Sequence, residues 1–444
     1  MELKYGLRLK PDSKIALVGS GGKTTTLFQL AREYESTVLA AAAAHMAPEQ
    51  LAYADRHFQI RDRSEIPAFR PKFQGQTLLF TGVPTASEER VQGLTQDVLE
   101  VLHNRAEEHK LPLLVEADGA RRMPLKAPAD HEPPIPPFVD TVIVVAGLSG
   151  LGRPLREGVV HRPDLFGKIA GLSLGETIHM RHLERILLSP EGSLKNIPSR
   201  ARKILLLNQA DAVKSLSGLD PLLRAVLDTY QAVGITSLGV RRRVYAVHEP
   251  LAGIVLAAGG SRRYGKSKQL LDWHGEPFVR QAAKTALEAG LDPVVVVTGA
   301  EEHRVRKAVS DLDVRCVHNP DWERGQSGSV RSGVRALPAQ VGGAAFLLAD
   351  QPQIPAALVS RLMTAHAQSH APIIVTRVAG QRTNPVLFDR ALFQDLKSLE
   401  GDVGGRALFD RYKLVYIPWE DPQIKFDVDT PEDYRQLLNR NLDG

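Results

Sequence analysis

Short apolar runs, rich in valine, isoleucine and leucine, alternate with helix-like stretches along the whole chain, and this alternation limits the folds that the chain can adopt. In the first part of the chain the runs are KIALVG, TVLAAA, TLLFTG, LPLLVEAD, DTVIVVAG and KILLLNQAD. Strands that are apolar along their length and separated by helices are typical of parallel sheets covered on both faces. The sequence therefore predicts an α/β protein.

A second series of apolar runs begins after the segment RRRVYAVHEP. It comprises AGIVLAAGG, PVVVVTGA, VRCVHN, AAFLLADQ, PIIVTRV and KLVYIP, and it does not repeat the first series in sequence. A chain of 444 residues is long for a single domain. We therefore expect two domains, 1–247 and 248–444, with the charged, Pro-ended segment from Arg241 to Pro250 as the boundary.

A Pro-rich segment, KAPADHEPPIPPF, runs from Lys126 to Phe138. Such a composition also occurs in linkers, but this segment lies inside the first series of strands. We expect it to form a structured loop beside a site.

Composition excludes several classes of function. The 56 basic and 51 acidic residues leave a net charge of +5, which is too small over this length to indicate a nucleic-acid partner. The single cysteine, Cys316, excludes an internal disulfide framework and fits a core thiol in a reducing compartment. No apolar run approaches the roughly 18 residues that span a bilayer, and the N-terminus lacks an apolar signal core. We therefore expect a cytoplasmic protein that binds neither membrane nor nucleic acid.

The strongest functional signal is the segment LAAGGSRRYGKSKQLL, from Leu256 to Leu271. Glycines after a strand let the backbone approach phosphate groups, and their amides can point at anionic oxygens. Arg263 and Lys268 add positive charge where a triphosphate would lie, and the spacing is not that of a Walker P-loop. The alternative is a Gly-rich turn with solvated charges. We expect this loop to bind a nucleotide through Ala258, Gly259, Gly260, Ser261 and Gly265.

Carboxylates stand at two further places in the second series. AAFLLADQPQI places Asp350 at the end of an apolar strand, and FDVDTPEDY supplies Asp427 and Asp429. Strand ends are where open α/β sheets collect ligands, and Mg²⁺ prefers oxygen ligands. We expect Asp350 to bind Mg²⁺ together with Asp427 or Asp429, between which the sequence does not choose. The alternatives are a turn residue at Asp350 and a helix cap at Asp429.

The first series contains its own Gly-rich loop. KIALVGSGGKTTTLFQL predicts a strand, a loop and a helix start. Backbone amides of this loop would hold phosphate, Lys23 would reach the outer phosphate oxygens, and a threonine hydroxyl would ligate Mg²⁺. The loop is P-loop-like but shorter than the standard form, because Leu17 stands where the standard spacing requires glycine. The candidate residues are Gly19, Gly21, Gly22, Lys23, Thr24 and Thr25.

Two other segments of the first series add candidates. LPLLVEADG supplies Glu116 and Asp118 after an apolar strand, where a Walker B carboxylate would stand near Mg²⁺. ILLLNQAD contains Asn208 and Asp211, which resemble the base-reading NKxD pattern of GTPases with Gln209 in place of the lysine.

Four segments of the second series together resemble one enzyme family: LAAGGSRRYGKSKQLL, NPDWERGQSGSVRSGV, LLADQPQI and FDVDTPEDY. They are similar to MobA-like nucleotidyltransferases, and most to the MocA-like molybdenum cofactor cytidylyltransferases. The resemblance implies a Rossmann-like domain with a mostly parallel sheet. It also implies that CTP and Mg²⁺ are used to convert Mo-molybdopterin into molybdopterin cytosine dinucleotide, with release of pyrophosphate.

The resemblance assigns roles to individual residues. It implies that Gly259, Gly260 and Arg263 hold the triphosphate, that Lys268 neutralises charge on the α-phosphate, and that Asp350 with Asp429 binds Mg²⁺. Base recognition would fall to Gly325, Ser327 and Ser329, for which the alternative is a Gly/Ser loop before a helix. LAAG in place of LAGG favours CTP over GTP. The segment QRTNPVLF departs from the family, in which a Gly-His-Pro-like triplet is common.

The N-terminal segments VGSGGKTTT, VEADGARRMPLKAPADHEP, VVAGLSGLGRPL, VVHRP and LLLNQAD resemble the YqeC-like family of accessory proteins of selenium-dependent molybdenum hydroxylases. The resemblance implies a domain that binds ATP or GTP and assists cofactor maturation, with a hydroxylase apoenzyme as partner. Relatives usually carry a Thr-rich run after the second strand, where this chain has alanines from Ala40 to Ala44, followed by His45. The missing hydroxyls leave nucleotide hydrolysis in this half without support.

These expectations combine into one leading hypothesis, a fused cofactor-maturation enzyme whose C-terminal half transfers the cytidylyl group. Two alternatives remain open. One is a different small-molecule nucleotidyltransferase, acting on a sugar or isoprenoid phosphate. The other is a non-catalytic molybdopterin carrier or insertion chaperone.

Overall fold

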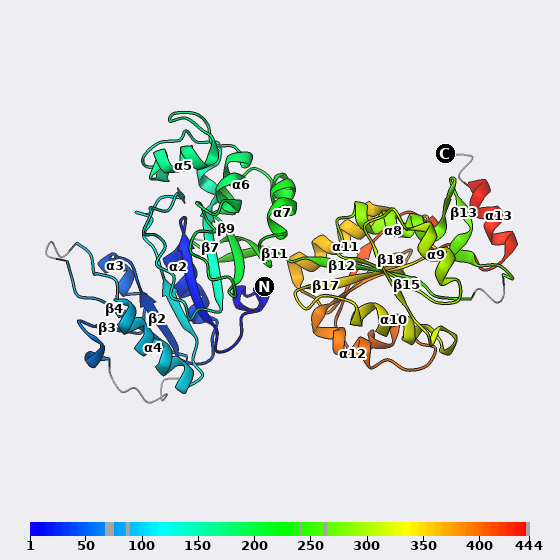
Figure 1. Cartoon of the computed structure of the whole chain (residues 1–444), viewed down its shortest axis with the longest axis horizontal. Coiled ribbons are helices and arrows are strands. Elements are labelled where there is room, and N and C mark those ends of the chain that lie inside the picture. The colour runs from blue at the N-terminus through cyan, green and yellow to red at the C-terminus, as the bar shows by residue number, and fades with distance from the viewer. Residues whose placement is uncertain (67–74, 86–88, 240, 261–263, 441–444) are drawn as a thin grey trace. The chain divides into compact units, whose positions relative to one another are not determined.

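Two separate sheets organise the chain, one in each of the units Met1–His248 and Glu249–Gly444 (Figure 1). The structure is a computed structural model and describes residues 1–66, 75–85, 89–239, 241–260 and 264–440. Each apolar run quoted above contains a strand, and the strands alternate with helices in both units. The predicted α/β class is therefore confirmed.

The sheet of the N-terminal unit has nine strands in the order β11-β10-β9-β7-β1-β5-β2-β4-β3. All neighbours are parallel except β10 and β11. The strands are β1 (Lys14–Gly19), β2 (Val38–Ala42), β3 (Arg56–Gln59), β4 (Thr77–Thr81), β5 (Leu113–Glu116), β7 (Thr141–Gly147), β9 (Arg202–Asn208), β10 (Ala232–Ser237) and β11 (Arg243–His248). A separate parallel pair is formed by β6 (Leu125–Lys126) and β8 (Val160–His161).

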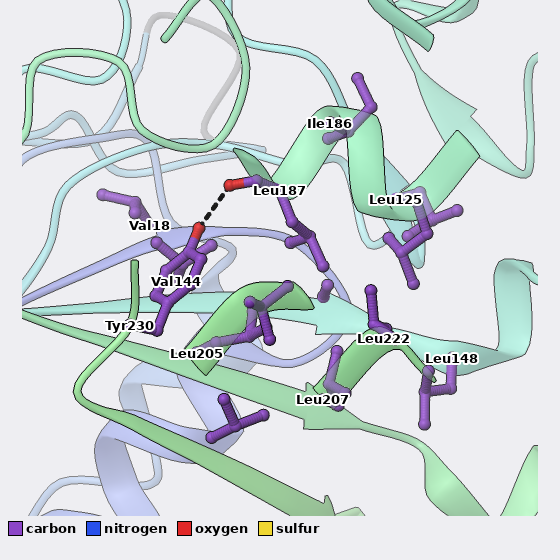
Figure 2. Packing of buried hydrophobic residues seen from close by; sticks show 14 of the residues in the cluster. Val18, Leu125, Val144, Leu148, Ile186, Leu187, Leu205, Leu207, Leu222 and Tyr230 are labelled. Carbon is purple, nitrogen blue, oxygen red and sulfur yellow. Dashed lines mark hydrogen bonds between the residues drawn. The ribbon is translucent and has the colours of Figure 1, made fainter. Parts of the chain in front are cut away.

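Helices cover both faces of this sheet, because alternate side chains of a strand point to opposite sides. Ile15 and Leu17 of β1 pack in one core cluster with residues of α2, whereas Ala16 and Val18 belong to the cluster on the other face, with α5, α6 and α7. Figure 2 shows that second cluster, in which the Tyr230 hydroxyl donates to the carbonyl of Leu187 at 2.7 Å. The helices are α1 (Leu3–Gly6), α2 (Lys23–Arg32), α3 (Pro48–Leu51), α4 (Gln96–Glu108), α5 (Pro163–Ala170), α6 (Met180–Leu188) and α7 (Asp220–Leu227).

The sheet of the C-terminal unit has seven strands in the order β16-β15-β12-β17-β19-β18-β20. Only β19 runs antiparallel to its neighbours, so the sheet is mostly parallel. The strands are β12 (Leu251–Ala257), β15 (Val294–Thr298), β16 (Arg315–His318), β17 (Gly343–Leu348), β18 (Ile373–Val378), β19 (Gln381–Asp389) and β20 (Leu414–Pro418). A short hairpin is formed by β13 (Asp272–Trp273) and β14 (Glu276–Pro277).

This sheet is also covered on both faces. One core cluster joins it to α8, α9 and α11, and the other joins it to α10 and α12. The helices are α8 (Phe278–Glu288), α9 (Glu302–Ala308), α10 (Gln326–Arg335), α11 (Ala356–Ser369), α12 (Phe393–Lys397) and α13 (Pro431–Arg440). Within the described ranges, no helix of either unit has the length and apolar character that crossing a bilayer requires.

Besides the two short pairs β6-β8 and β13-β14, the two large sheets contain four strands that were not expected from the sequence: β3, β10, β11 and β19. The segment from Arg241 to Pro250, interpreted above as a boundary, contains β11, which closes the first sheet as an antiparallel edge strand. Its first residue, Arg243, is exposed, while Ala246 and Val247 are buried. Edge strands commonly carry charged side chains, and such a half-polar pattern resembles a linker in sequence.

Candidate nucleotide-binding sites

The N-terminal Gly-rich loop connects β1 to α2 at the carboxyl edge of the sheet. Gly19, Gly21 and Gly22 have φ angles of 92°, 81° and 128°, which L side chains rarely adopt. A Cβ on Gly19 would lie 2.3 Å from the backbone oxygen of Val145, and one on Gly22 would lie 2.3 Å from Nδ2 of Asn208. The loop therefore needs glycine at these positions, and its backbone is held close to neighbouring strands.

Lys23 opens α2 and folds back over the loop. Its Nζ donates to the carbonyl of Gly19 at 2.8 Å and lies 3.2 Å from Oδ1 of Asp118 and 3.8 Å from Oε1 of Glu116. The Thr24 hydroxyl donates to Oε2 of Glu116 at 2.8 Å. Burial raises the pKa of Glu116, although Lys23 and Thr24 oppose this effect. The hydroxyl of Thr24 and the carboxylate of Glu116 lie side by side next to the Gly-rich loop, and such oxygen ligands fit Mg²⁺.

A buried ladder of alternating charges runs from the loop into the Pro-rich segment. Lys126 Nζ donates to Oδ2 of Asp118 at 2.7 Å, to the carbonyl of Gly119 at 2.8 Å and to Oε2 of Glu132 at 2.9 Å. Arg162 binds both oxygens of Glu132 at 2.8 Å. Burial by itself would raise the pKa of Glu132, but Arg162 and Lys126 outweigh it and lower the pKa to about 2. The Pro-rich segment is thus a structured part of the site.

The loop forms one end of a pocket of about 1340 Å³. Thr25, Ala44 and His45 line it, together with Gly21, Gly22, Lys23, Thr24 and Glu116. Ala40 to Ala42 of β2 are buried in the sheet. Of the five alanines that stand where relatives carry a Thr-rich run, only Ala44 lines the pocket.

Asn208 and Asp211, interpreted from the sequence as base readers, make contacts within the protein. Asn208 Nδ2 donates to the carbonyl of Gly21 at 2.8 Å, and its Oδ1 accepts from Thr236 and from the backbone of Leu238. Asp211 is exposed and accepts from the Ser237 hydroxyl at 2.7 Å. Asn208 thus holds the Gly-rich loop in place.

The C-terminal loop follows β12 in the same way. Ala258 is buried, and the carbonyl of Gly259 accepts from Nε2 of Gln269 at 2.9 Å. A Cβ on Gly260 would lie 2.6 Å from the ring of Trp322, so the indole packs directly against this backbone. Gly265 adopts a φ of 76° before Lys268. Ser261 and Arg263, two residues predicted for this site, lie outside the described residues.

Lys268 joins two carboxylates that the sequence separates widely. Its Nζ lies 2.6 Å from Oδ1 of Asp429 and 3.8 Å from Oδ2 of Asp350, which follows β17. Burial raises the pKa of Asp350, Lys268 lowers it, and the negative charges of Asp427 and Asp429 raise it further. The structure therefore brings together Lys268, Asp350 and Asp429 at the carboxyl edge of β12 and β17.

Asp427 lies near the same group but is held differently. Its Oδ1 accepts from Nε2 of Gln351 at 2.5 Å, and Oε1 of Gln351 is buried without a hydrogen-bond partner among the described residues. Within the described part of the chain, no group of three His, Cys, Asp or Glu residues could hold a metal ion by protein ligands alone. Carboxylate oxygens next to an unsatisfied amide oxygen nevertheless fit Mg²⁺, which usually takes its remaining ligands from water and substrate phosphates.

The segment predicted for base recognition opens α10. Gly325 has a φ of 109° and packs against Asp402, whose Oδ1 accepts from the backbone nitrogen of Gln326 at 3.0 Å. Ser327 and Ser329 are buried, and Ser329 accepts from Asn319 Nδ2 at 3.1 Å. Asp402 thus caps this helix, and the two serines lie on its inner side.

Sequence reasoning missed several residues that build these sites. Gln269, Trp322 and Gln351 hold the C-terminal loop and Asp427, while Lys126, Glu132 and Arg162 extend the ladder in the N-terminal unit. Burial of Lys126 could not be predicted, although Asp118 and Glu132 lie only eight and six residues away, because this stretch has no regular period that shows which side chains meet.

Two known families match separate parts of the chain. The family model of the MobA-like NTP transferase domain matches residues 253–415, and the model of the YqeC protein matches residues 15–164.

Individual relatives are similar to about half of the chain each. The protein YqeC of Escherichia coli (strain K12) is 31% identical over 221 residues, which cover 48% of this chain and 83% of that protein. The purine catabolism protein PucB of Bacillus subtilis (strain 168) is 34% identical, covering 41% of this chain and 94% of PucB. The probable molybdenum cofactor guanylyltransferase of Opitutus terrae (strain DSM 11246 / JCM 15787 / PB90-1) is 33% identical, covering 41% of this chain and 92% of that protein.

Proposed function

The chain belongs to the MobA-like NTP transferase family through its C-terminal part and to the YqeC family through its N-terminal part, and from this premise we propose that it is a molybdenum cofactor cytidylyltransferase. The reaction would join CTP and Mo-molybdopterin into molybdopterin cytosine dinucleotide and release pyrophosphate. The observation that carries the proposal is the contact of Lys268 with Asp350 and Asp429 beside the glycine loop.

The residues at this edge suit a direct displacement. A phosphate oxygen of the acceptor attacks the α-phosphorus of the nucleotide, and the bond from that phosphorus to the oxygen bridging to the β-phosphate breaks. Lys268 would neutralise the charge that grows on the α-phosphate oxygens, and the loop at Gly259 and Gly260 would hold the leaving phosphates. Such a transfer needs positioning and electrostatic stabilisation more than covalent catalysis.

Asp350 and Asp429 would hold Mg²⁺, with Asp427 as the alternative second carboxylate. Bound Mg²⁺ would supply positive charge to the phosphates of the nucleotide. Lys268 forms ion pairs with both of these carboxylates. Gln351 keeps Asp427 oriented through its amide.

The N-terminal unit would bind ATP or GTP at the Gly-rich loop and assist delivery of the finished cofactor to a molybdenum hydroxylase apoenzyme. Three left-handed glycines, the helix start at Lys23 and the Thr24–Glu116 pair support nucleotide binding. Titration of the full chain with fluorescent ATP and GTP analogues tests this part. We expect Lys23→Ala to lose nucleotide binding. The control Lys168→Ala, at an exposed lysine, should retain it.

The choice of CTP is tested separately from the transfer itself. The chain is incubated with each nucleoside triphosphate, Mg²⁺ and Mo-molybdopterin, and pyrophosphate and dinucleotide are measured. We expect product with CTP in preference to GTP. Product formed from GTP in preference to CTP would support nucleotidyl transfer but refute the choice of CTP. GTP is the necessary comparison because the chain is similar to a probable molybdenum cofactor guanylyltransferase.

The carrier alternative predicts a different response to substitution. Lys268→Ala and Asp350→Ala should lower dinucleotide formation about 10²-fold or more and, with it, the ability of the chain to mature a hydroxylase. Maturation that persists at the original level in both variants would favour a carrier that binds molybdopterin without turnover.

A further inference from the structure

The pocket of the N-terminal unit is larger than a nucleotide site requires. Ligand pockets usually enclose about 300–1,000 Å³, and this one has about 1340 Å³. The Gly-rich loop and Lys23 form only part of its lining. Another part, which we call the arginine wall, consists of Arg121, Arg122, His161 and Arg162. The pocket therefore has space for a second ligand beyond the phosphate loop.

The backbone of the arginine wall is unusual. Arg121, Arg122 and Arg162 have φ angles of 46°, 60° and 63°, in the left-handed region that residues with a side chain rarely adopt. Such conformations persist only where the surrounding structure imposes them, and they gather at ligand sites. Three arginines in this conformation on one pocket indicate that the fold directs their side chains to a common place.

Carboxylates compensate part of the charge of the wall, and Glu89, Glu157 and Asp164 also line the pocket. Glu132 is bound by Arg162 and Lys126, and Glu49 is bound by Arg122 at 2.9 Å. Arg121 makes no ion pair within the described part of the chain. Burial, together with the positive charges of Arg162, Lys126 and Arg121, lowers the pKa of His161 to about 4, so this ring is neutral at pH 7. A neutral imidazole among arginines can form hydrogen bonds with an anion without adding a charge of its own.

We propose that the arginine wall binds the phosphate group of a second small molecule while the Gly-rich loop holds a nucleotide, which makes the N-terminal unit a site for two ligands. The presence of two ligands at once rests on the nucleotide binding proposed above, whereas the phosphate site rests on the wall alone. Guanidinium groups bind phosphate through paired, charge-assisted hydrogen bonds.

The charge ladder places the two parts of the pocket in a fixed relation. Lys23 of the loop and Arg162 of the wall are its two ends, and Asp118, Lys126 and Glu132 connect them through contacts of 2.7 to 3.2 Å. Lys23, Asp118 and Lys126 are almost fully buried. The ladder thus gives a physical role to Asp118, Lys126 and Glu132.

Inorganic phosphate is the probe for this site. All chains carry Lys268→Ala, to remove the corresponding cation of the C-terminal unit, and phosphate binding is followed by ³¹P NMR titration of the full chain. The test variant is Arg121→Gln with Arg122→Gln, which replaces two exposed side chains. The matched control is Arg224→Gln, an exposed arginine of α7 that does not line the pocket. Circular dichroism verifies that each variant is folded.

We expect the double variant to weaken phosphate binding about tenfold or more, as the loss of charge-assisted hydrogen bonds requires, and to leave binding of ATP and GTP analogues unchanged. The control should change neither. When a saturating concentration of nucleotide occupies the Gly-rich loop, titration with phosphate should still show binding at the arginine wall. This measurement separates the two sites without a substitution in the loop. Equal phosphate affinity in the double variant and the control would overturn the proposal. The chain could bind no nucleotide and still bind phosphate in a way that depends on the arginines. This result would support the arginine wall and would refute only the proposed nucleotide binding at the Gly-rich loop.

Discussion

Replacement of Glu132 by glutamine tests the charge ladder most directly. In the folded chain, Arg162 and Lys126 lower the pKa of this carboxyl from 4.5 to about 2. The difference corresponds to roughly 3 kcal/mol in favour of the charged form. Glutamine has nearly the same shape but no charge, so Arg162 loses its carboxylate and the buried Lys126 keeps only Asp118 as a charged partner. We expect Glu132→Gln to lower the free energy of unfolding of the N-terminal unit by about 3 kcal/mol, within the range for breaking a buried ion pair.

The tryptophans of this chain make the assay specific for one unit. All three, Trp273, Trp322 and Trp419, lie in the C-terminal unit. During urea unfolding, tryptophan fluorescence reports that unit alone, whereas far-UV circular dichroism reports both. The variant should shift the circular dichroism transition of the N-terminal unit to lower urea and leave the fluorescence transition in place. Glu191→Gln, at an exposed and loosely paired glutamate, is the control and should change stability by less than about 0.5 kcal/mol.

The pH dependence gives a second check with a defined sign. Because the folded pKa of Glu132 lies below the unfolded value, its contribution is fully present above about pH 4.5 and is lost as pH falls toward about 2. The difference between wild type and Glu132→Gln should therefore be constant from pH 7 to about pH 5 and should shrink below that. A loss of less than about 1 kcal/mol at pH 7, or a difference that already shrinks near neutral pH, would refute the reasoning.

Four further predictions concern the two loops and the metal carboxylates. Lys268→Ala should lower kcat about 10²- to 10³-fold, as loss of one electrostatic stabiliser does, whereas the exposed-lysine control Lys307→Ala should not; steady-state kinetics decide this. Gly260→Val would drive a side chain into Trp322, which a Cβ already approaches to 2.6 Å, and should raise the KM for nucleotide. Gly22→Ala should abolish nucleotide binding at the N-terminal loop, because the added Cβ would lie 2.3 Å from Asn208. The control Gly175→Ala, at a glycine that also has a positive φ but faces open space, should bind nucleotide normally. Titration with a fluorescent nucleotide measures binding by both variants. Because burial and the neighbouring carboxylates raise the pKa of Asp350, the velocity at limiting Mg²⁺ should rise with pH through a midpoint above that of an ordinary aspartate, and Asp350→Asn should remove this dependence.

The local sequence by itself determined the class of fold and both Gly-rich loops. A buried parallel strand needs a run of apolar residues, and a phosphate loop needs consecutive glycines, so both signals lie within a few adjacent residues. The same reasoning failed for β11 and β19. Their pairing partners, and not their own composition, make them strands, since β11 closes one sheet as an antiparallel edge and β19 lies between β17 and β18.

The tertiary structure alone decided which polar side chains meet. Lys268, Asp350 and Asp429 come from distant segments, and Arg162 meets Glu132, which lies 30 residues earlier in the chain. Such contacts depend on strand order and register, where a shift of one residue turns every side chain to the opposite face. For this reason the sequence indicated two nucleotide loops, whereas the charge ladder and the arginine wall became visible only in the folded chain.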